Sequence, residues 1–450
     1  MSSLFLHRLN VRGRFSIPKL SITWMEMLIN PGIVWTGVKV SDNINPYRMG
    51  NELPEECKMK RSLLGIAVCL GMVFSLFFCL PACKKEAAGP KVETIDGVTY
   101  VHNPATPLHP GRTVAFEEDF TFKEKDEAGE IRIYKPGRFI VDSQGNVFVQ
   151  DNSDMAIKVF DAQGKYLRAV GRKGSGPGEF GQIADMAILP DGRLLFTDFE
   201  TRRTSLFNRD GQFLSSFQWK KFFSQVYLVT DSSYTVADMV VSERARELWV
   251  KTIDFNGEEI LTFGKFSYPE FKMLQQGEIT FSTSVPWSPQ SVFAGDQKRQ
   301  WLYHCLNDKY VIEVYDSQGK LFRKIDRPYE PAPVTSADTA EFMSRFKDRP
   351  DSPFAKMAKE MELPKVKTVT DRMVVDSEGN LWVRTNEEKK EDDKTFTAVD
   401  ILDPEGFYTA RVWLDIFPAL FAAGKMYRAF EDEGTGLSQL KRYRVVWKES

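Results

Sequence analysis

One pattern of short apolar runs and glycine-bearing turns occurs twice between residues 137 and 217. The first copy, residues 139–170, reads FIVDSQGNVFVQDNSDMAIKVFDAQGKYLRAV, and the second, residues 186–217, reads MAILPDGRLLFTDFETRRTSLFNRDGQFLSSF. Each copy has four runs rich in Val, Ile, Leu, Phe and Tyr, which is typical of β-strands, and the Asp- and Gly-containing turns between them are typical of hairpins. Each copy therefore predicts a four-stranded antiparallel sheet.

The spacing of the turns shows that these sheets repeat. Gly145 and Gly192 are 47 positions apart, and so are Gly164 and Gly211. A four-stranded antiparallel unit that recurs every 47 residues is typical of the blade of a β-propeller.

The rest of the chain continues the pattern and predicts an all-β fold, a six-bladed β-propeller of four-stranded antiparallel blades over residues 112–450. Five complete blades are expected at about 138–170, 183–217, 223–263, 291–326 and 370–414. The last stretch, 419–447, holds three further strands, and Arg112–Phe122 is a single strand without a hairpin partner nearby. We expect this strand to complete the sixth blade, because ring closure removes an exposed sheet edge.

A small helical insertion, Pro328–Pro364, separates blades four and five. Ser352 and Pro353 suit the N-cap and first position of a helix. Phe354, Met357, Ala358 and Met361 follow at spacings that form one apolar helix face. A preceding helix is expected at about residues 337–346. As a link between blades, the insertion should rise from the face that carries such links, either covering part of the channel mouth or packing against blades four and five.

The N-terminal region has the pattern of an export signal. Lys60 and Arg61 precede an uncharged apolar run over residues 63–80, and Leu80-Pro81-Ala82-Cys83 resembles a bacterial lipobox. This predicts a lipoprotein signal peptide over 59–82, lipidation of Cys83 and a lipidated tether over 83–111. Residues 1–58 are then a misassigned upstream segment or a disordered extension. The alternative is an uncleaved membrane anchor, since 18 apolar residues nearly span a bilayer.

Composition limits the classes of partner. The net charge is only −2, so there is no basic footprint for nucleic acid. Beyond the signal, Cys83 and Cys305 are the remaining cysteines. If Cys83 carries lipid, Cys305 has no intramolecular partner, and the folded part contains no disulfide.

Blades one and two, with LPDGR, FDAQGKYLRAVG and the linking segment GSGPGEF, resemble NHL-repeat six-bladed propellers. Together with the lipobox, the chain resembles exported propeller lipoproteins of Gram-negative bacteria. The resemblance implies a monomeric binding protein in the cell envelope, lipid-anchored on the periplasmic side of the outer membrane or at the cell surface. It does not imply one chemistry.

Catalysis is the competing interpretation. A metal-assisted hydrolase or lyase of the amidating-lyase type needs zinc-binding histidines, but only His102, His109 and His304 follow the signal. Gluconolactonase-like propellers bind a divalent ion through acidic and amide side chains in the channel. Residues of this type follow second strands here, where they are also ordinary turn residues: Asp151, Asn152, Asp198, Asn307 and Asp308. We therefore expect no metal and no cofactor, and favour binding over catalysis.

The expected function is a binding or scaffold module for a protein, peptide or glycan. Loops joining second to third strands and the links between blades emerge on one face, and such loops commonly carry function on a rigid scaffold. The candidate binding residues belong to that face or its margin: Asp151, Asp154, Arg202, Arg203, His304, Asn307 and Arg384.

Overall fold

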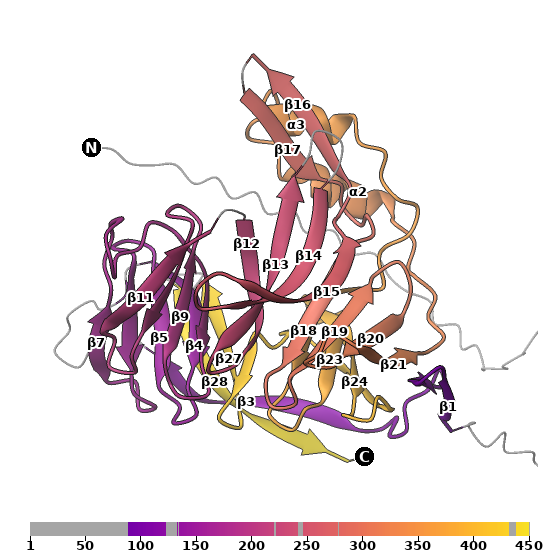
Figure 1. Cartoon of the computed structure of the whole chain (residues 1–450). Coiled ribbons are helices and arrows are strands. Elements are labelled where there is room, and N and C mark those ends of the chain that lie inside the picture. Colours follow the sequence, from indigo (N-terminus) through magenta and orange to yellow (C-terminus); the bar gives the residue numbers. More distant parts are fainter. Residues whose placement is uncertain are drawn as a thin grey trace, which may run out of the picture. The chain divides into compact units, whose positions relative to one another are not determined.

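The described residues form seven sheets in the computed structural model, and six of them are the blades of a ring around a central channel (Figure 1). The structure describes residues 89–122, 133, 135–219, 222–241, 246–277, 279–431 and 438–449. These residues belong to one compact unit that spans Cys83–Ser450. The expected signal peptide and Cys83 lie outside the described residues.

The first three blades follow one another along the chain, and each uses four consecutive strands. Blade one contains β4 (Pro136–Val141), β5 (Val147–Asp151), β6 (Ala156–Phe160) and β7 (Tyr166–Val170). Blade two contains β8 (Ile183–Ile188), β9 (Leu194–Asp198), β10 (Arg203–Phe207) and β11 (Phe213–Gln218). Blade three contains β12 (Phe222–Val229), β13 (Ser233–Val241), β14 (Arg246–Asp254) and β15 (Glu259–Ser267).

The last three blades complete the ring. Blade four contains β18 (Ser291–Asp296), β19 (Trp301–Leu306), β20 (Val311–Tyr315) and β21 (Leu321–Asp326). Blade five contains β22 (Thr370–Val375), β23 (Leu381–Glu391), β24 (Lys394–Leu402) and β25 (Tyr408–Leu414). Blade six contains β26 (Leu420–Ala422), β27 (Lys425–Glu431), β28 (Ser438–Lys448) and, as its outermost strand, β3 (Thr113–Phe122).

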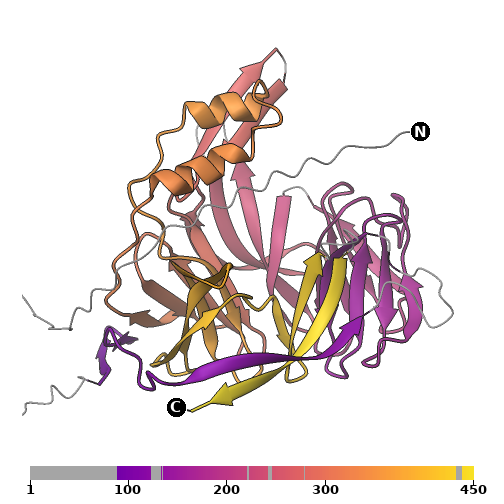
Figure 2. The same ribbon diagram turned by 180° about the vertical axis from the view of Figure 1, so that it is seen from behind.

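The strand β3 closes the ring, as the sequence predicts. It pairs antiparallel with β28 from Leu440↔Phe122 to Lys448↔Thr113 (Figure 2). The same sheet therefore contains segments from both ends of the propeller. This pairing covers the edge that β28 would otherwise expose.

The turns within the blades depend on glycine. In the D-x-x-G turns the aspartate accepts backbone hydrogen bonds, as when Asp142 accepts from the amides of Gln144 at 2.9 Å and Asn146 at 2.8 Å. The glycine then adopts a positive φ, +83° at Gly145 and +78° at Gly164, which residues with a Cβ rarely adopt. The turn glycines therefore repeat in the sequence because the backbone of each turn requires a positive φ at that position.

The core consists of six apolar clusters, one between each pair of neighbouring blades. Phe148 and Phe196 belong to the cluster between blades one and two, and Phe293 and Val250 to the one between blades three and four. The last cluster joins Tyr427 of blade six to residues of blade one, such as Val147 and Phe160. Each sheet thus buries both faces against its neighbours, which holds the ring together without a disulfide among the described residues.

The expected tether is wrong over part of its length. Residues 91–102 form a hairpin of β1 (Lys91–Ile95) and β2 (Val98–His102), and β2 pairs in parallel with β21, the outer strand of blade four. Asn103 then donates to the carbonyl of Gly406 at 2.9 Å and accepts from the amide of Tyr408 at 2.8 Å. The sequence predicts β21 as the outermost strand of blade four, with an unpaired edge. The hairpin pairs with this edge, which explains why the segment is bound to the propeller.

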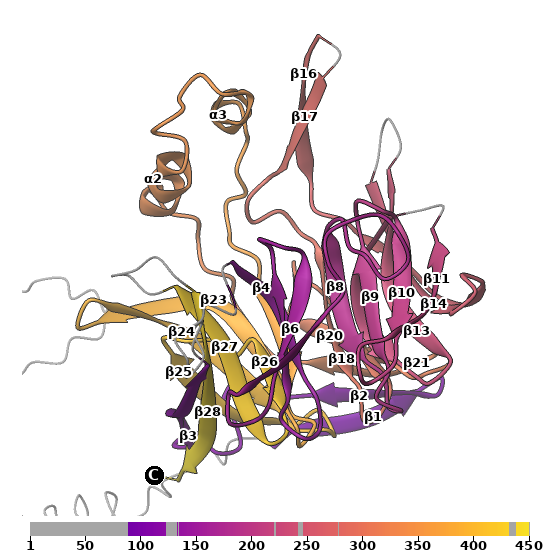
Figure 3. The ribbon, with the colours of Figure 1, turned by 90° about the vertical axis from the view of Figure 1, so that its left-hand side faces the viewer.

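Two segments project from one face of the ring (Figure 3). The predicted helical insertion contains α2 (Ser336–Ser344) and α3 (Pro353–Lys359), with Ser352 as the N-cap of α3. A hairpin that the sequence analysis missed, β16 (Phe271–Gln276) and β17 (Ile279–Ser284), lies between blades three and four. We call the face that carries these segments and the link 171–182 the loop-rich face.

Candidate functional site

The first strands of the blades line the channel. Neighbouring blades contact one another through β4, β8, β12, β18, β22 and β26 in turn. In four of these strands the pairing with the second strand is interrupted near its start, between Pro136 and Phe139, Ile183 and Asp185, Phe223 and Val226, and Thr370 and Arg372. Such bulges change the direction in which side chains point. They occur where the strands enter from the loop-rich face.

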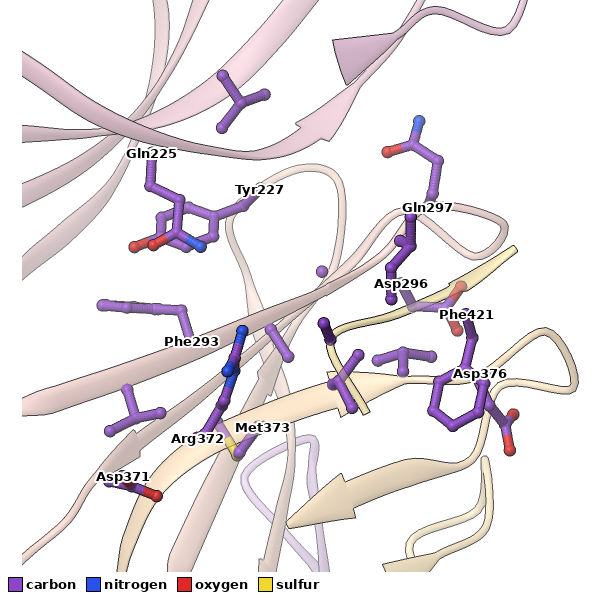
Figure 4. A pocket seen from close by; sticks show the side chains of 18 of the residues that line it. Gln225, Tyr227, Phe293, Asp296, Gln297, Asp371, Arg372, Met373, Asp376 and Phe421 are labelled. Atoms are coloured by element: carbon purple, nitrogen blue, oxygen red, sulfur yellow. The ribbon is translucent and has the colours of Figure 1, made fainter. Parts of the chain in front are cut away.

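A cavity of about 710 Å³ runs along the channel, from Gln290 and Asp371 near the loop-rich face to Asp296 and Asp376 at the far ends of β18 and β22; we call it the channel cavity (Figure 4). Its lining includes Gln225 and Tyr227 of β12, Phe293 of β18, and Asp371 and Arg372 of β22. The side chains of Gln225 and Arg372 enter it from facing strands. A polar cavity of this size with a few aromatic rings is suited to a small ligand or to one part of a larger ligand.

Several charged groups in the lining are already used by the fold. Asp296 accepts from the amides of Lys298 and Arg299, each at 3.0 Å, and forms an ion pair with the Arg299 guanidinium. Asp376 accepts from the Trp382 indole at 2.9 Å. Arg372, by contrast, has no hydrogen bond or ion pair from its guanidinium to any described residue and is exposed to the cavity.

Asp185 of β8 connects three blades at the channel. One oxygen lies 3.5 Å from Nη1 of Arg138 in β4, and the other accepts from the amide of Val226 in β12 at 2.8 Å. Burial raises the pKa of Asp185 above its usual value, although Arg138 and the amide favour the charged form. Burial also raises the pKa of the neighbouring Tyr227, so its hydroxyl stays protonated.

Two further cavities adjoin the channel cavity. One, of about 740 Å³, lies over blades one and two and shares Arg138 with it. The other, of about 340 Å³, shares Asp371 and is lined by Phe342 and Arg345 of the helical insertion and by Trp287. The helical insertion therefore reaches the margin of the channel mouth.

Among the described elements, the main contacts of α3 are with β16, β17 and α2. Phe354 meets Phe281 edge to face at 5.8 Å between ring centroids. The hairpin and the insertion thus support each other above the ring. The alternative in which the insertion only covers the side of these blades is not what the structure shows.

Three of the seven candidate binding residues are buried. Asp151 accepts from the amide of Lys135 at 3.0 Å, and Asn307 accepts from the amide of Gln290 at 2.7 Å. Both side chains bind the backbone amide that comes immediately before the first strand of a blade, β4 for Asp151 and β18 for Asn307. His304 lies 3.1 Å from both Glu313 and the hydroxyl of Ser291. These side chains serve the fold.

Three other candidates lie on blades one and two. Asp154 is exposed and forms an ion pair with Lys158. Arg202 is exposed in the turn immediately before β10, with a positive φ of 50°. Arg203 donates to the carbonyls of Gly176 at 2.9 Å and Ser175 at 2.6 Å, so it orders the glycine-rich link. A ligand contact by any of them remains a prediction.

The seventh candidate, Arg384 of β23, lies close to the channel. Its Nε donates to Asp371 at 2.7 Å, and Asp371 lines the channel cavity. Sequence reasoning missed Arg138, Gln225 and Arg372, which line the cavity itself. A usable signal existed, because each is a polar residue near the start of a first strand that ends in a run of apolar residues.

The described residues contain no group of three or more His, Cys, Asp or Glu side chains placed to hold a metal ion. No helix among them has the length and apolar character to cross a membrane.

Comparison with solved structures gives distant likenesses. A Bacteroides fragilis protein whose export is inferred has 11% identity and a TM-score of 0.44, covering 78% of this chain and 99% of its own. A DUF4221 member from Bacteroides vulgatus has 9% identity and a TM-score of 0.45, covering 76% and 98%. Virginiamycin B lyase from Staphylococcus aureus has 11% identity and a TM-score of 0.36, covering 74% and 99%.

Sequence comparison is more direct. No curated protein shows a significant match. Residues 133–265, which span blades one to three, match the family model described as 6-bladed beta-propeller, DUF5128. With the six sheets described above, this match identifies the chain as an all-β, six-bladed β-propeller.

Proposed function

We propose that the chain is an exported, lipid-anchored binding module that holds a protein, peptide or glycan ligand at the mouth of its propeller channel. The observation that carries the proposal is the channel cavity of about 710 Å³, whose lining includes residues at the loop-rich ends of β12, β18 and β22. Gln225 and Arg372 enter it from facing strands. Pockets that combine concave shape, aromatic rings and a few polar groups are the usual ligand sites of proteins.

The surroundings of the cavity support a binding role. The helical insertion and the β16–β17 hairpin stand on the same face, and α2 lines the smaller cavity beside Asp371. Loops on a rigid scaffold often determine which ligand is bound. We propose that the insertion covers part of the channel mouth and contributes to ligand selection.

The export and lipid anchoring of the protein are part of the proposal. Its support is the Met59–Cys83 pattern of two cations, an apolar run and a lipobox-like ending. Mass spectrometry of membrane-extracted protein is expected to find an acylated peptide that begins at Cys83. Intact peptides from residues 1–58 in the mature protein would contradict the interpretation of these residues as a misassigned upstream segment.

The binding role is tested by screening the purified protein against peptide and glycan arrays. Hydrogen exchange with a bound ligand should then show protection at residues 225–227, 290–293 and 371–374, which line the channel cavity. Protection confined to the outermost strands would place the ligand elsewhere and contradict the proposal.

A further inference from the structure

Three arginines gather around one phenylalanine beside the channel cavity. The guanidinium carbons of Arg372 and Arg384 lie 6.0 and 5.5 Å from the ring centroid of Phe417. Arg428 of β27 donates to the backbone carbonyl of the same residue. Strands from blades five and six therefore bring three cationic groups to one corner of the channel.

Their charge is only partly compensated. Among the described residues, Asp371 is the one acidic group that forms an ion pair with any of the three, and it does so with Arg384. Three guanidinium groups and one carboxylate leave two positive charges. Nε of Arg428 is buried without a hydrogen-bond partner.

The cluster has an energetic cost in the unliganded protein. Burial lowers the pKa of Arg372, and the positive charge of Arg384 lowers it further. Burial also lowers the pKa of Arg428, followed by the charges of Arg372 and Arg384. Like charges in a site that is partly removed from water repel one another, so a bound anion would relieve this repulsion.

Arg372 is the member of the cluster that a ligand can reach. It lines the channel cavity, and its guanidinium extends into the space near Phe293 (Figure 4). A guanidinium presents several N–H donors in a plane, which fits two oxygens of a carboxylate or phosphate.

We infer that Arg372 binds an oxyanion, a carboxylate or a phosphate, of a small ligand or ligand group held in the channel cavity, with Arg384 and Arg428 supplying supporting positive charge. This inference rests on the proposed binding function and names the chemistry of the ligand. The cavity of about 710 Å³ has room for a sugar acid or a sugar phosphate.

The test is calorimetric titration of the full chain at constant ionic strength with three probes of similar size: glucuronate, glucose 6-phosphate and glucose. We expect one or both anions to bind and glucose to bind more weakly. Binding of glucuronate alone would identify a carboxylate site, and binding of glucose 6-phosphate alone a phosphate site; either supports the inference.

Substitution of Arg372 then locates the binding. Arg372→Gln should weaken anion binding about tenfold, the loss expected for one charge-assisted hydrogen bond. Arg372→Lys keeps the charge but not the planar donor pair, so its loss should be smaller. Arg209→Gln, an exposed arginine in the turn between β10 and β11 on the opposite face, removes the same charge and should change nothing.

Thermal unfolding separates a binding role from a structural one. Because Arg372→Gln removes like-charge repulsion, its Tm should equal or exceed that of the wild type. A lower Tm, equal affinity for anions in the wild type and Arg372→Gln, or no anion binding at all would each overturn the inference. If any of these results is obtained but a ligand found on the arrays still slows hydrogen exchange in the channel strands, the proposed binding function holds and only the oxyanion inference fails.

Discussion

Arg327 and Asp400 form an ion pair that is closed to solvent. Nε of Arg327 donates to Asp400 at 2.9 Å, and the two side chains are 4% and 0% exposed. Arg327 leaves blade four at the root of the helical insertion, whereas Asp400 lies in β24 of blade five. The pair therefore fixes the base of the insertion to the neighbouring blade.

Other groups complete the surroundings of this pair. The Arg327 guanidinium carbon lies 4.5 Å from the ring centroid of Tyr310 and 5.0 Å from that of Tyr408. Asp400 also accepts from the Tyr408 hydroxyl at 2.9 Å and from Nε of Arg411 at 2.8 Å. The Asp400 carboxylate thus accepts hydrogen bonds from the side chains of Arg327, Tyr408 and Arg411.

Removing one member of this pair should destabilise the protein strongly. We expect Arg327→Ala to lower the free energy of unfolding by about 3–5 kcal/mol, because the Asp400 carboxylate stays buried with its charge undercompensated. Denaturant unfolding measures the change. The control is Lys389→Ala, which removes an exposed ion pair with Glu391 and should cost less than about 1 kcal/mol. Equal effects of the two variants would contradict the role given to the buried pair.

Ring closure should depend on β3 and not on the hairpin before it. A protein that starts at residue 104 lacks β1 and β2 but keeps β3, and we expect it to unfold cooperatively. A protein that starts at residue 123 lacks β3, which exposes the edge of β28 and removes Phe122 from its cluster. It should aggregate or lose its cooperative transition in calorimetry. A normal transition in the shorter protein would show that β3 is not needed for closure.

Acid should weaken the contact between β19 and β20. A hydrogen bond from His304, followed by those from Lys324 and Tyr315, lowers the pKa of Glu313 to about 2 against an ordinary value of 4.5. A carboxyl group with a lowered pKa in the folded state stabilises the protein above its unfolded pKa, and this stabilisation is lost as the pH falls from about 4.5 towards 2.

The variant Glu313→Gln should therefore show a smaller loss of stability between pH 5 and pH 2 than the wild type. Denaturant unfolding across this range measures the slope. Glu258→Gln changes an exposed carboxylate that forms no ion pair among the described residues, so its slope should match the wild type. A Glu313→Gln slope equal to the wild type would show that this carboxyl does not contribute.

The helical insertion should affect binding more than stability. Its base is closed by an antiparallel bridge between Pro333 and Val366, so residues 335–364 can be replaced by a short Gly-Ser linker. We expect Tm to change by only a few degrees, since the six clusters between blades remain. Affinity for an array ligand should fall, because α2 lines the margin of the channel mouth. Unchanged affinity would reduce the insertion to a structural role.

The fold could be predicted largely from local chemistry. Turns such as Asp142–Gly145 need a glycine with positive φ, and such glycines recur in the sequence at the spacing of the blades. The closing strand was predictable because three strands at the end and one at the start lack partners. The parallel pairing of β2 with β21 was not predictable, because it joins segments more than 200 residues apart and has no turn that marks it.

The site was harder to predict than the fold. Asp151 and Asn307 look like exposed loop residues in the sequence, but they hold backbone amides at the starts of first strands. Arg372 looks like part of an ordinary strand. Only the bulge between Thr370 and Arg372 and the position of β22 beside the channel give it access to the cavity. The sequence predicts Arg384 as a candidate binding residue because of its expected place on the loop-rich face. It does not predict its partner Asp371, which lines the channel cavity.

The most direct test of the central claim is to block the channel mouth. Gln225 is exposed and enters the channel cavity, so Gln225→Trp should fill this space without removing a core contact. The matched control is Gln163→Trp, an exposed glutamine in the turn between β6 and β7 on the opposite face. We expect Gln225→Trp to lower the affinity for a ligand found on the arrays at least tenfold, while Gln163→Trp keeps wild-type affinity and both keep wild-type Tm. Wild-type affinity in Gln225→Trp would contradict a binding site in the channel mouth.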